Sequence, residues 1–153
     1  MNYLALPNIH RAQPGEYKIG DHLFYDRAFS VPGLSHHAVY TGNGEVVHYW
    51  GDNTDVNSTD KQFLNATVQK MPIKTFELLA AKKGETIYVI DHPFRLPRKQ
   101  TVQRCLQALG QSGYCPFTNN CESFVNFCVL GNPRSLQVES LNEKYNSLKP
   151  RMN

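Results

Sequence analysis

The stretch from Asn119 to Cys128 places a cysteine at the start of a predicted helix. Asn119 is a good N-cap residue, and Glu122 follows three positions later, which is the spacing of a capping box. The apolar side chains that follow recur at the spacing of one helix face and end in a glycine suited to a C-terminal cap: Cys121, Phe124, Val125, Cys128 and Gly131. We therefore expect Cys121 in the first turn, where free backbone N–H groups favour a thiolate over a thiol.

Two interpretations of Cys121 follow from this helix alone. A thiolate at a helix start is one way to present a nucleophile, whereas a free cysteine is also a common small apolar residue of a core. The chain has four cysteines, at positions 105, 115, 121 and 128, with no Cys-x-x-Cys pair. This spacing argues against a zinc ribbon and against a thioredoxin-type motif.

Composition bounds the class of protein. The 153 residues are enough for one domain with a real core, and 41% hydrophobic with 19% charged residues is typical of a globular chain. A net charge of +3, scattered along the chain, does not indicate nucleic-acid binding. No apolar run approaches the ~20 residues of a membrane span, and no signal pattern is present, so we expect a cytoplasmic protein.

The clearest local structure is a hairpin of two strands, residues 37–41 and 45–50, joined by Gly42-Asn43-Gly44. Residues 1–19 resemble a surface arm, and the polar stretch 51–67 has the length of a lid or binding loop. Further elements are expected as extended segments at 68–73, 75–79 and 85–90, and as helices at 102–109 and 135–148.

The register of this hairpin decides whether two of the six histidines can cooperate. If Asn43-Gly44 is a two-residue loop, His36 and His48 point to opposite faces of the sheet. If Gly42-Asn43-Gly44 is a three-residue loop with a bulge, Ala38 faces His48. His36 and His48 are then diagonal neighbours on one face, with backbones about 7–8 Å apart. The sequence leaves both registers open.

The second register predicts a nucleophile–base–orienter relay. His36 would take the proton of Cys121, and His48 would hold the His36 ring through its other nitrogen. Two alternatives stand beside this hypothesis. The histidines can be ordinary strand residues, or His36, His48 and Cys121 can be ligands of a zinc ion, although their spacing matches no familiar zinc motif.

Both segments together resemble the lecithin:retinol acyltransferase family. The run from His36 to His48 is similar to that family's histidine box, and Asn120-Cys121-Glu122-Ser123-Phe124 is similar to its Asn-Cys-Glu-His-Phe box. The resemblance spans roughly residues 14–131 of a single domain, 1–153, with an arm at 1–13 and a tail at 132–153. It implies an α+β fold in which an antiparallel sheet packs with helices, as a circularly permuted NlpC/P60 papain-like domain.

The resemblance also assigns roles residue by residue. Cys121 falls on the family's nucleophile, His36 on its general base and His48 on the histidine that orients the base. Two positions depart from the family: Ser123 stands where the family usually has His, and His37 takes the place of the aromatic residue after the first histidine of the box. Neither is catalytic, but both adjoin the site and bear on substrate choice.

The resulting hypothesis is a cysteine-dependent acyltransferase or hydrolase that acts on an ester or amide, such as a phospholipid acyl chain or a peptide. The backbone N–H of Cys121 and Asn120 are the expected oxyanion donors. The chemistry requires no cofactor or metal, and contact with a membrane surface is compatible with a lipid substrate. The alternatives are a thiol peptidase or amidase and a non-enzymatic interaction module.

Overall fold

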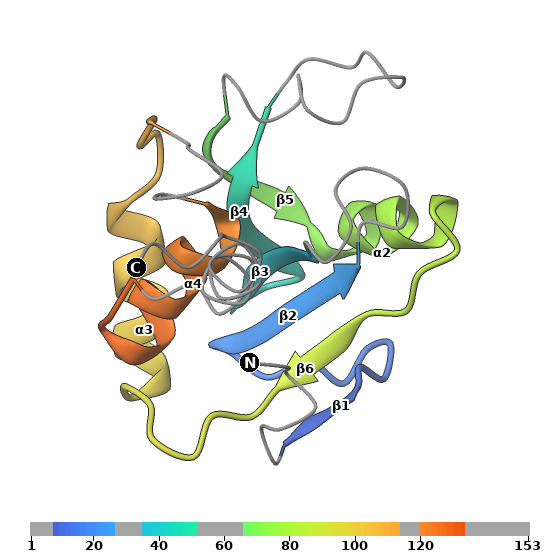
Figure 1. Ribbon diagram of the computed structural model, residues 1–153, viewed down its shortest axis with the longest axis horizontal. Helices are drawn as coiled ribbons and strands as arrows, with labels where there is room; N and C mark the ends of the chain where they lie inside the picture. The colour runs from blue at the N-terminus through green and yellow to red at the C-terminus, as the bar shows by residue number, and fades with distance from the viewer. Residues whose placement is uncertain (1–7, 27–34, 52–65, 114–119, 134–153) are drawn as a thin grey trace, which may run out of the picture.

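The fold is described from a computed structural model of the chain, which describes residues 8–26, 35–51, 66–113 and 120–133. Within these ranges, six strands form one sheet in the order β1-β6-β2-β3-β4-β5 (Figure 1). Every neighbouring pair is antiparallel. The strands are β1 (Ile9–Arg11), β2 (Asp21–Asp26), β3 (Ser35–Gly42), β4 (Glu45–Trp50), β5 (Thr67–Pro72) and β6 (Tyr88–Ile90).

Helices cover both faces of this sheet. Helices α3 (Arg98–Gln107) and α4 (Cys121–Leu130) lie on one side, and α2 (Ile73–Lys82) lies on the other (Figure 1). The predicted α+β class, with an antiparallel sheet packed by helices, is confirmed. The predicted hairpin is confirmed as β3 and β4, and the helix expected at 102–109 is α3.

The alternation of side chains along β3 and β4 separates two buried clusters. Odd-numbered residues such as Val39 and Val47 pack with Phe124, Val125 and Cys128 of α4. Even-numbered residues such as Ala38 and Val46 pack with Phe76 and Ala80 of α2. Because successive strand residues point to opposite faces, the hairpin register fixes which side chains reach which helix.

The extended segment expected at 75–79 is wrong, since these residues belong to α2. The buried side chains of α2 are Phe76 and Ala80, four residues apart on one face. Pro72 precedes the helix with φ −58°, a conformation that leads the chain directly from β5 into α2. Helical periodicity therefore prevails over the β-branched residues at positions 73 and 75.

Other differences lie at the ends of elements. The expected surface arm contains the edge strand β1, which pairs with β6, and β6 is shorter than the strand expected at 85–90. Most of the polar stretch 51–67, the cysteine at 115 and the helix expected at 135–148 lie outside the described residues. The domain limits drawn from the sequence stay predictions.

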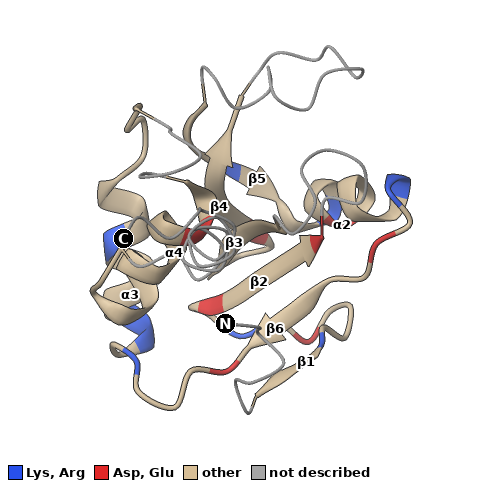
Figure 2. Ribbon diagram, in the orientation of Figure 1, with Lys and Arg blue, Asp and Glu red and all other residues tan. Residues whose placement is uncertain are grey.

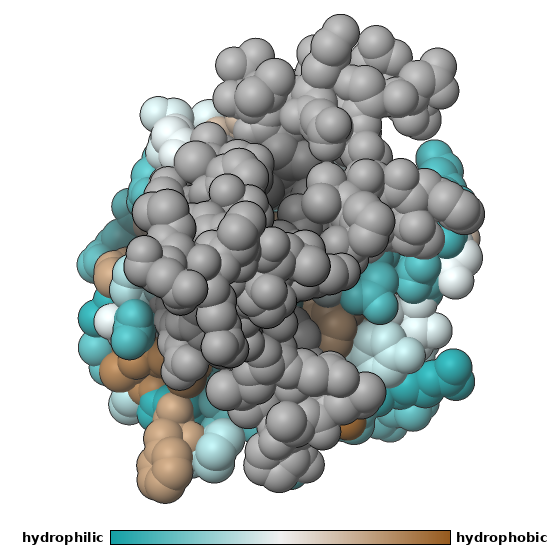
Figure 3. Space-filling view, viewed as in Figure 1, coloured by the Kyte–Doolittle hydropathy of each residue, from teal (hydrophilic) through white to brown (hydrophobic). Residues whose placement is uncertain are grey.

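The described surface is mixed in character. Lys, Arg, Asp and Glu are scattered over the elements in Figure 2, and hydrophobic colours interrupt the visible hydrophilic surface in Figure 3. The most exposed large apolar side chain is Phe94, 89% accessible, in the connection between β6 and α3. No helix in the described part of the chain has the length and hydrophobicity to cross a bilayer.

Candidate functional site

Helix α4 begins with a capping box that lies one residue later than the sequence suggests. Asn120, not Asn119, is the N-cap, and its side-chain oxygen accepts a hydrogen bond from the backbone nitrogen of Ser123 at 2.8 Å. The Ser123 hydroxyl oxygen in turn accepts from the backbone nitrogen of Asn120 at 2.9 Å. Ser123, the third residue of the helix, thus takes the place expected for Glu122 as the partner of the N-cap in the box. The expected position of Cys121, in the first helical turn, is confirmed.

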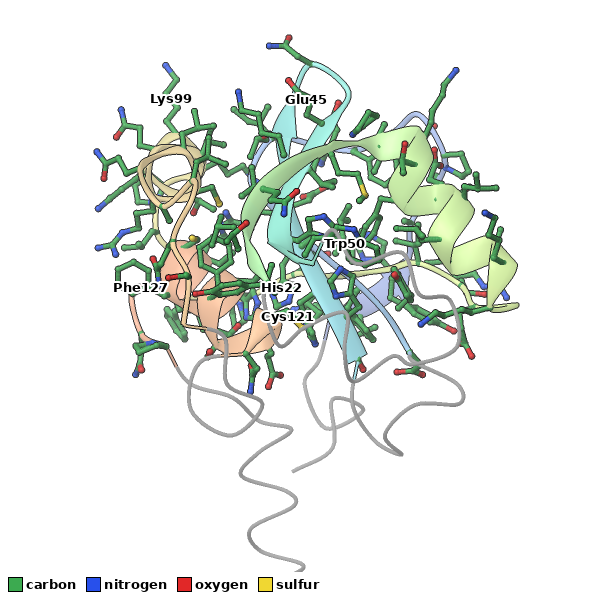
Figure 4. The ribbon with its side chains drawn as sticks, turned by 90° about the horizontal axis from the view of Figure 1, so that it is seen from above. His22, Glu45, Trp50, Lys99, Cys121 and Phe127 are labelled. Carbon is green, nitrogen blue, oxygen red and sulfur yellow. The ribbon has the colours of Figure 1, made fainter. Side chains whose placement is uncertain are left out.

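The thiol of Cys121 contacts the beginning of β3. Its side chain is buried, and its Sγ donates to the backbone carbonyl oxygen of Ser35 at 3.4 Å. Ser35 is the first residue of β3 and is followed directly by His36. The start of α4 and the start of β3 therefore lie together, with Cys121 near the middle of the molecule in Figure 4.

The hairpin combines features of both registers considered above. Asn43 and Gly44 form a two-residue turn, with φ of 55° and 72°, and Gly42 pairs with Glu45. A bulge then lies between Gly42 and Tyr40, so that Tyr40 pairs with Val46 and Val39 with Val47. The extra residue, Thr41, shifts the pairing by one.

This shift places His36 and His48 on one face of the sheet. His36 Nε2 lies 2.8 Å from His48 Nδ1, so one imidazole donates a hydrogen bond to the other. Both side chains are buried, with 1% and 0% of their surface accessible. The two histidines that the sequence proposes as a pair are therefore in direct contact.

Three aromatic rings enclose the histidine pair. Trp50 stacks on His48 with 5.3 Å between ring centroids and 6° between planes, and it meets His36 edge-on at 5.6 Å. Tyr25 of β2 and Phe76 of α2 complete the enclosure. Burial lowers the pKa of His48 from its ordinary 6.5 to about 3, so this imidazole is neutral at physiological pH.

The Cys121 thiol and the histidine pair belong to different layers, on opposite faces of the sheet. Cys121 belongs to the cluster between the sheet and α4, whereas His36 and His48 are on the face that α2 covers. The beginning of β3 joins the two layers, because Ser35 contacts the thiol and the next residue carries the imidazole. The structure thus brings two of the three proposed residues into contact and places the third beside their strand.

A second set of histidines was missed by the sequence interpretation. His22 Nε2 lies 2.7 Å from His37 Nδ1, and His22 Nδ1 lies 2.9 Å from His92 Nε2. Burial lowers the pKa of His22, and it lowers that of His92 to about 4. His37 therefore points away from the His36–His48 pair. No sequence signal links residues 15 and 70 positions apart, because only the sheet order brings β2, β3 and the end of β6 together.

Neither a metal ion nor the two other described cysteines, Cys105 and Cys128, is assigned a function in this site. In the described ranges, no group of three or more His, Cys, Asp or Glu side chains is placed to hold a metal ion. The zinc alternative therefore gains no support from these residues. Cys105 of α3 and Cys128 of α4 are buried in the same apolar cluster.

Comparison with known proteins gives a family. The family model described as lecithin retinol acyltransferase matches residues 15–134. The human protein named phospholipase A and acyltransferase 2 is 34% identical over 112 residues, covering 69% of this chain and 68% of that protein. The mouse phospholipase A and acyltransferase 3 is 31% identical over 113 residues, covering 70% and 69%.

A more distant relative is longer than this chain. The rat lecithin retinol acyltransferase is 27% identical over 126 residues, which are 72% of this chain but only 54% of the rat protein. The chain thus spans about half the length of that relative. Both boxes singled out in the sequence, around His36 and Cys121, lie inside the range that the family model matches.

Proposed function

The chain belongs to the lecithin retinol acyltransferase family and is an enzyme of the acyltransferase or hydrolase class, and we propose that it works through an acyl-cysteine on Cys121. In this proposal His36 is the general base and acid, and His48 orients it. The observation that carries the proposal is the buried His36 Nε2–His48 Nδ1 hydrogen bond at 2.8 Å. Because this bond engages Nε2 of His36, the proposal assigns proton exchange with the thiol to Nδ1 of the same ring.

The first half-reaction forms a thioester. The Cys121 proton passes to His36 Nδ1, and Sγ attacks the carbonyl carbon of the acyl donor. The bond to the leaving group then breaks, and His36 gives its proton to the departing oxygen or nitrogen. In the second half-reaction, water, an alcohol or an amine gives a proton to His36 and attacks the thioester, and the thiolate recovers that proton.

His48 has a defined part in this cycle because it stays neutral. A neutral imidazole has one N–H, so when Nδ1 of His48 accepts from His36, the His48 proton resides on Nε2. His48 can then accept the Nε2–H of His36 both before and after His36 takes the thiol proton. This arrangement keeps the His36 ring in one tautomer and stabilises the imidazolium as it forms.

Negative charge on the tetrahedral intermediate falls at the start of α4. The backbone N–H of Cys121 is at the first helical position, where N–H groups point out along the helix axis. Asn120 uses its side-chain oxygen for the Ser123 cap, so its side-chain nitrogen is the part that is suited to donate to an oxyanion. Both donors are held in place by the capping box.

The names of the relatives suggest the acyl donor. Two of them are named phospholipase A and acyltransferase, and we infer that this chain cleaves a fatty acyl ester of a glycerophospholipid at a membrane surface. A peptide or other amide is the alternative substrate class.

The test is intact-mass spectrometry of the protein after incubation with phosphatidylcholine vesicles. We expect a mass increase of one fatty acyl group on wild-type protein, removed by hydroxylamine, and none on Cys121→Ser. Cys105→Ser, at a buried cysteine of the same cluster, is the matched control and should still be acylated. Small peptide amides in place of vesicles address the alternative substrate.

A second comparison separates the two adjacent histidines. His36→Ala should slow acylation by about 10²- to 10⁴-fold, the usual contribution of a general base. His37→Ala, which removes the neighbouring ring of the other histidine set, should have a much smaller effect. If acylation survives His36→Ala and fails in His37→Ala, the base is assigned wrongly; if no thioester forms at all, the covalent mechanism fails.

A further inference from the structure

We propose that Trp50 is a positioning residue for the histidine pair, holding the His48 ring by stacking and keeping water from the His36–His48 hydrogen bond. This inference rests on the proposed function of that pair. Trp50 is the last residue of β4, two positions after His48 and on the same face of the sheet. Figure 4 shows Trp50 in the central part of the molecule.

The geometry of the indole fits this role. Planes only 6° apart at a centroid distance of 5.3 Å describe an offset stack, which fixes the rotation of the His48 ring. The edge-on contact with His36 at 5.6 Å means that one indole touches both members of the pair. Tyr25 and Phe76 contact the pair from β2 and α2, so Trp50 is the part of the enclosure contributed by β4.

The backbone of Trp50 is held by β5. The side-chain nitrogen of Gln69 donates to the carbonyl oxygen of Trp50 at 2.8 Å and to the hydroxyl of Thr67 at 3.1 Å. Trp50 also pairs with Thr67 in the sheet. An indole carried on such a fixed strand end loses little further conformational freedom when it stacks, so its position is preorganised.

Within the described ranges, burial is the one cause that acts on the pKa of His48. Among the described residues packed around His48, the titratable groups are the imidazole of His36 and the phenol of Tyr25; β5 contributes the neutral Gln69 and α2 contributes Phe76. Burial is the cause of the lowered pKa of His48. Trp50 is half-buried, whereas Tyr25 and Phe76 are fully buried, so the indole is the one of these three rings that reaches the surface.

The consequence is that His48 can accept the hydrogen bond from His36 over a wide pH range. A protonated His48 has N–H on both ring nitrogens and cannot accept from His36. In the wild type this happens only near pH 3. Without the indole, water reaches the ring and the pKa of His48 rises toward its ordinary value, so reactivity should be lost at a higher pH as the solution is acidified.

The first experiment uses the fact that Trp50 is the single tryptophan of the chain. An imidazolium in contact with indole quenches its fluorescence, so emission reports on the charge of His36 and His48, and the His48→Gln variant identifies the part due to His48. We expect emission to be constant from pH 8 to pH 5, with circular dichroism confirming that the fold persists. A quenching step near pH 6.5 that is absent in His48→Gln would overturn the proposal. This measurement needs no enzymatic activity, so it stands even if the acyl-cysteine mechanism fails.

The second experiment follows the rate of Cys121 alkylation by iodoacetamide against pH in Trp50→Phe, Trp50→Leu and Trp50→Ala. We expect Trp50→Phe to resemble wild type, because it retains a stacked ring. In Trp50→Ala the acid limb should move up by about 1 to 2 pH units, the size of shift that partial hydration causes, with Trp50→Leu between them. Phe94→Ala, at an exposed aromatic residue, is the control. Identical profiles for all four variants would show that Trp50 is only a packing residue.

Discussion

His36 and His48 are hydrogen-bonded at 2.8 Å because one residue, Thr41, is extra in the strand between them. Without a shift, a two-residue turn at Asn43-Gly44 would put the two imidazoles on opposite faces of the sheet. Gly42 pairs with Glu45 on one side of the bulge, and Tyr40 pairs with Val46 on the other. From the bulge to the start of β3, each side chain therefore points to the face opposite the one it would have without the shift. A backbone irregularity at Thr41, five residues after His36 in the same strand, thereby assembles the pair.

Asn43 should be sensitive to the shape of its replacement. Its φ of 55° is in the left-handed region, which Asn and Gly tolerate and β-branched residues do not. We expect Asn43→Gly to change the free energy of unfolding by less than about 0.5 kcal/mol and Asn43→Val to lower it by roughly 1–2 kcal/mol. Urea denaturation measures both. Equal stability of the two variants would show that the turn differs from the one described.

Ser123 should matter for the start of α4 and not only for the family pattern. Ser123→Ala removes a hydroxyl that bonds the backbone of Asn120 as donor and acceptor. We expect a loss of about 1 kcal/mol in the free energy of unfolding and slower alkylation of Cys121, since the first turn frays. Ser123→Thr retains the hydroxyl and is the control. If Ser123→Ala is destabilised but Cys121 is alkylated at the wild-type rate, the cap does not contribute to the reactivity of the thiol.

The sequence predicts the pieces of the site better than their assembly. The pattern after Asn119 identifies the helix and the placement of Cys121 in its first turn, and the glycine-rich tip identifies the hairpin. The exact cap was wrong by one residue because Asn119 and Asn120 are equivalent as N-cap types. The structure then shows Ser123 in the capping box, where a hydroxyl serves as well as the expected Glu122 carboxylate.

The register could not be chosen because it depends on a bulge at Thr41, which the residues of the turn do not specify. Gly42-Asn43-Gly44 is compatible with a two-residue loop and with a three-residue loop. The observed hairpin has the two-residue turn, and its bulge gives the strand pairing expected for the three-residue loop. The His37–His22–His92 set depends on sheet order alone. The error at α2 has a different origin: its two buried side chains, Phe76 and Ala80, are a short signal beside β-branched neighbours.

Mild acid should destabilise the protein through its buried histidines. The folded-state pKa is about 3 for His48 and about 4 for His92, and that of His22 is also lowered. The unfolded chain therefore binds more protons below pH 6.5. Stability is complete above that pH and falls as the pH drops toward the folded-state values, by ~1.4 kcal/mol per pH unit for each fully buried histidine.

Urea titrations between pH 7 and pH 5 test this dependence before most carboxylates titrate. The slope of the free energy of unfolding against pH should be reduced in His48→Gln, which removes one such group. A flat wild-type profile in this range would mean that these imidazoles are not held neutral by the fold.

Cys105 should be inert toward alkylation in the folded protein. Its hydrogen bond with Cys128 and its burial both raise the pKa of the Cys105 thiol, so almost no thiolate is present at pH 8. Peptide mapping after brief iodoacetamide treatment at pH 8 should find Cys121 modified well before Cys105, and both modified in urea. Cys105→Val keeps an apolar side chain between α3 and α4 and should leave the rate at Cys121 unchanged. Equal labelling of Cys105 and Cys121 in the folded state would contradict the buried Cys105–Cys128 pair. It would also show that Cys121 is no more reactive than a buried packing cysteine.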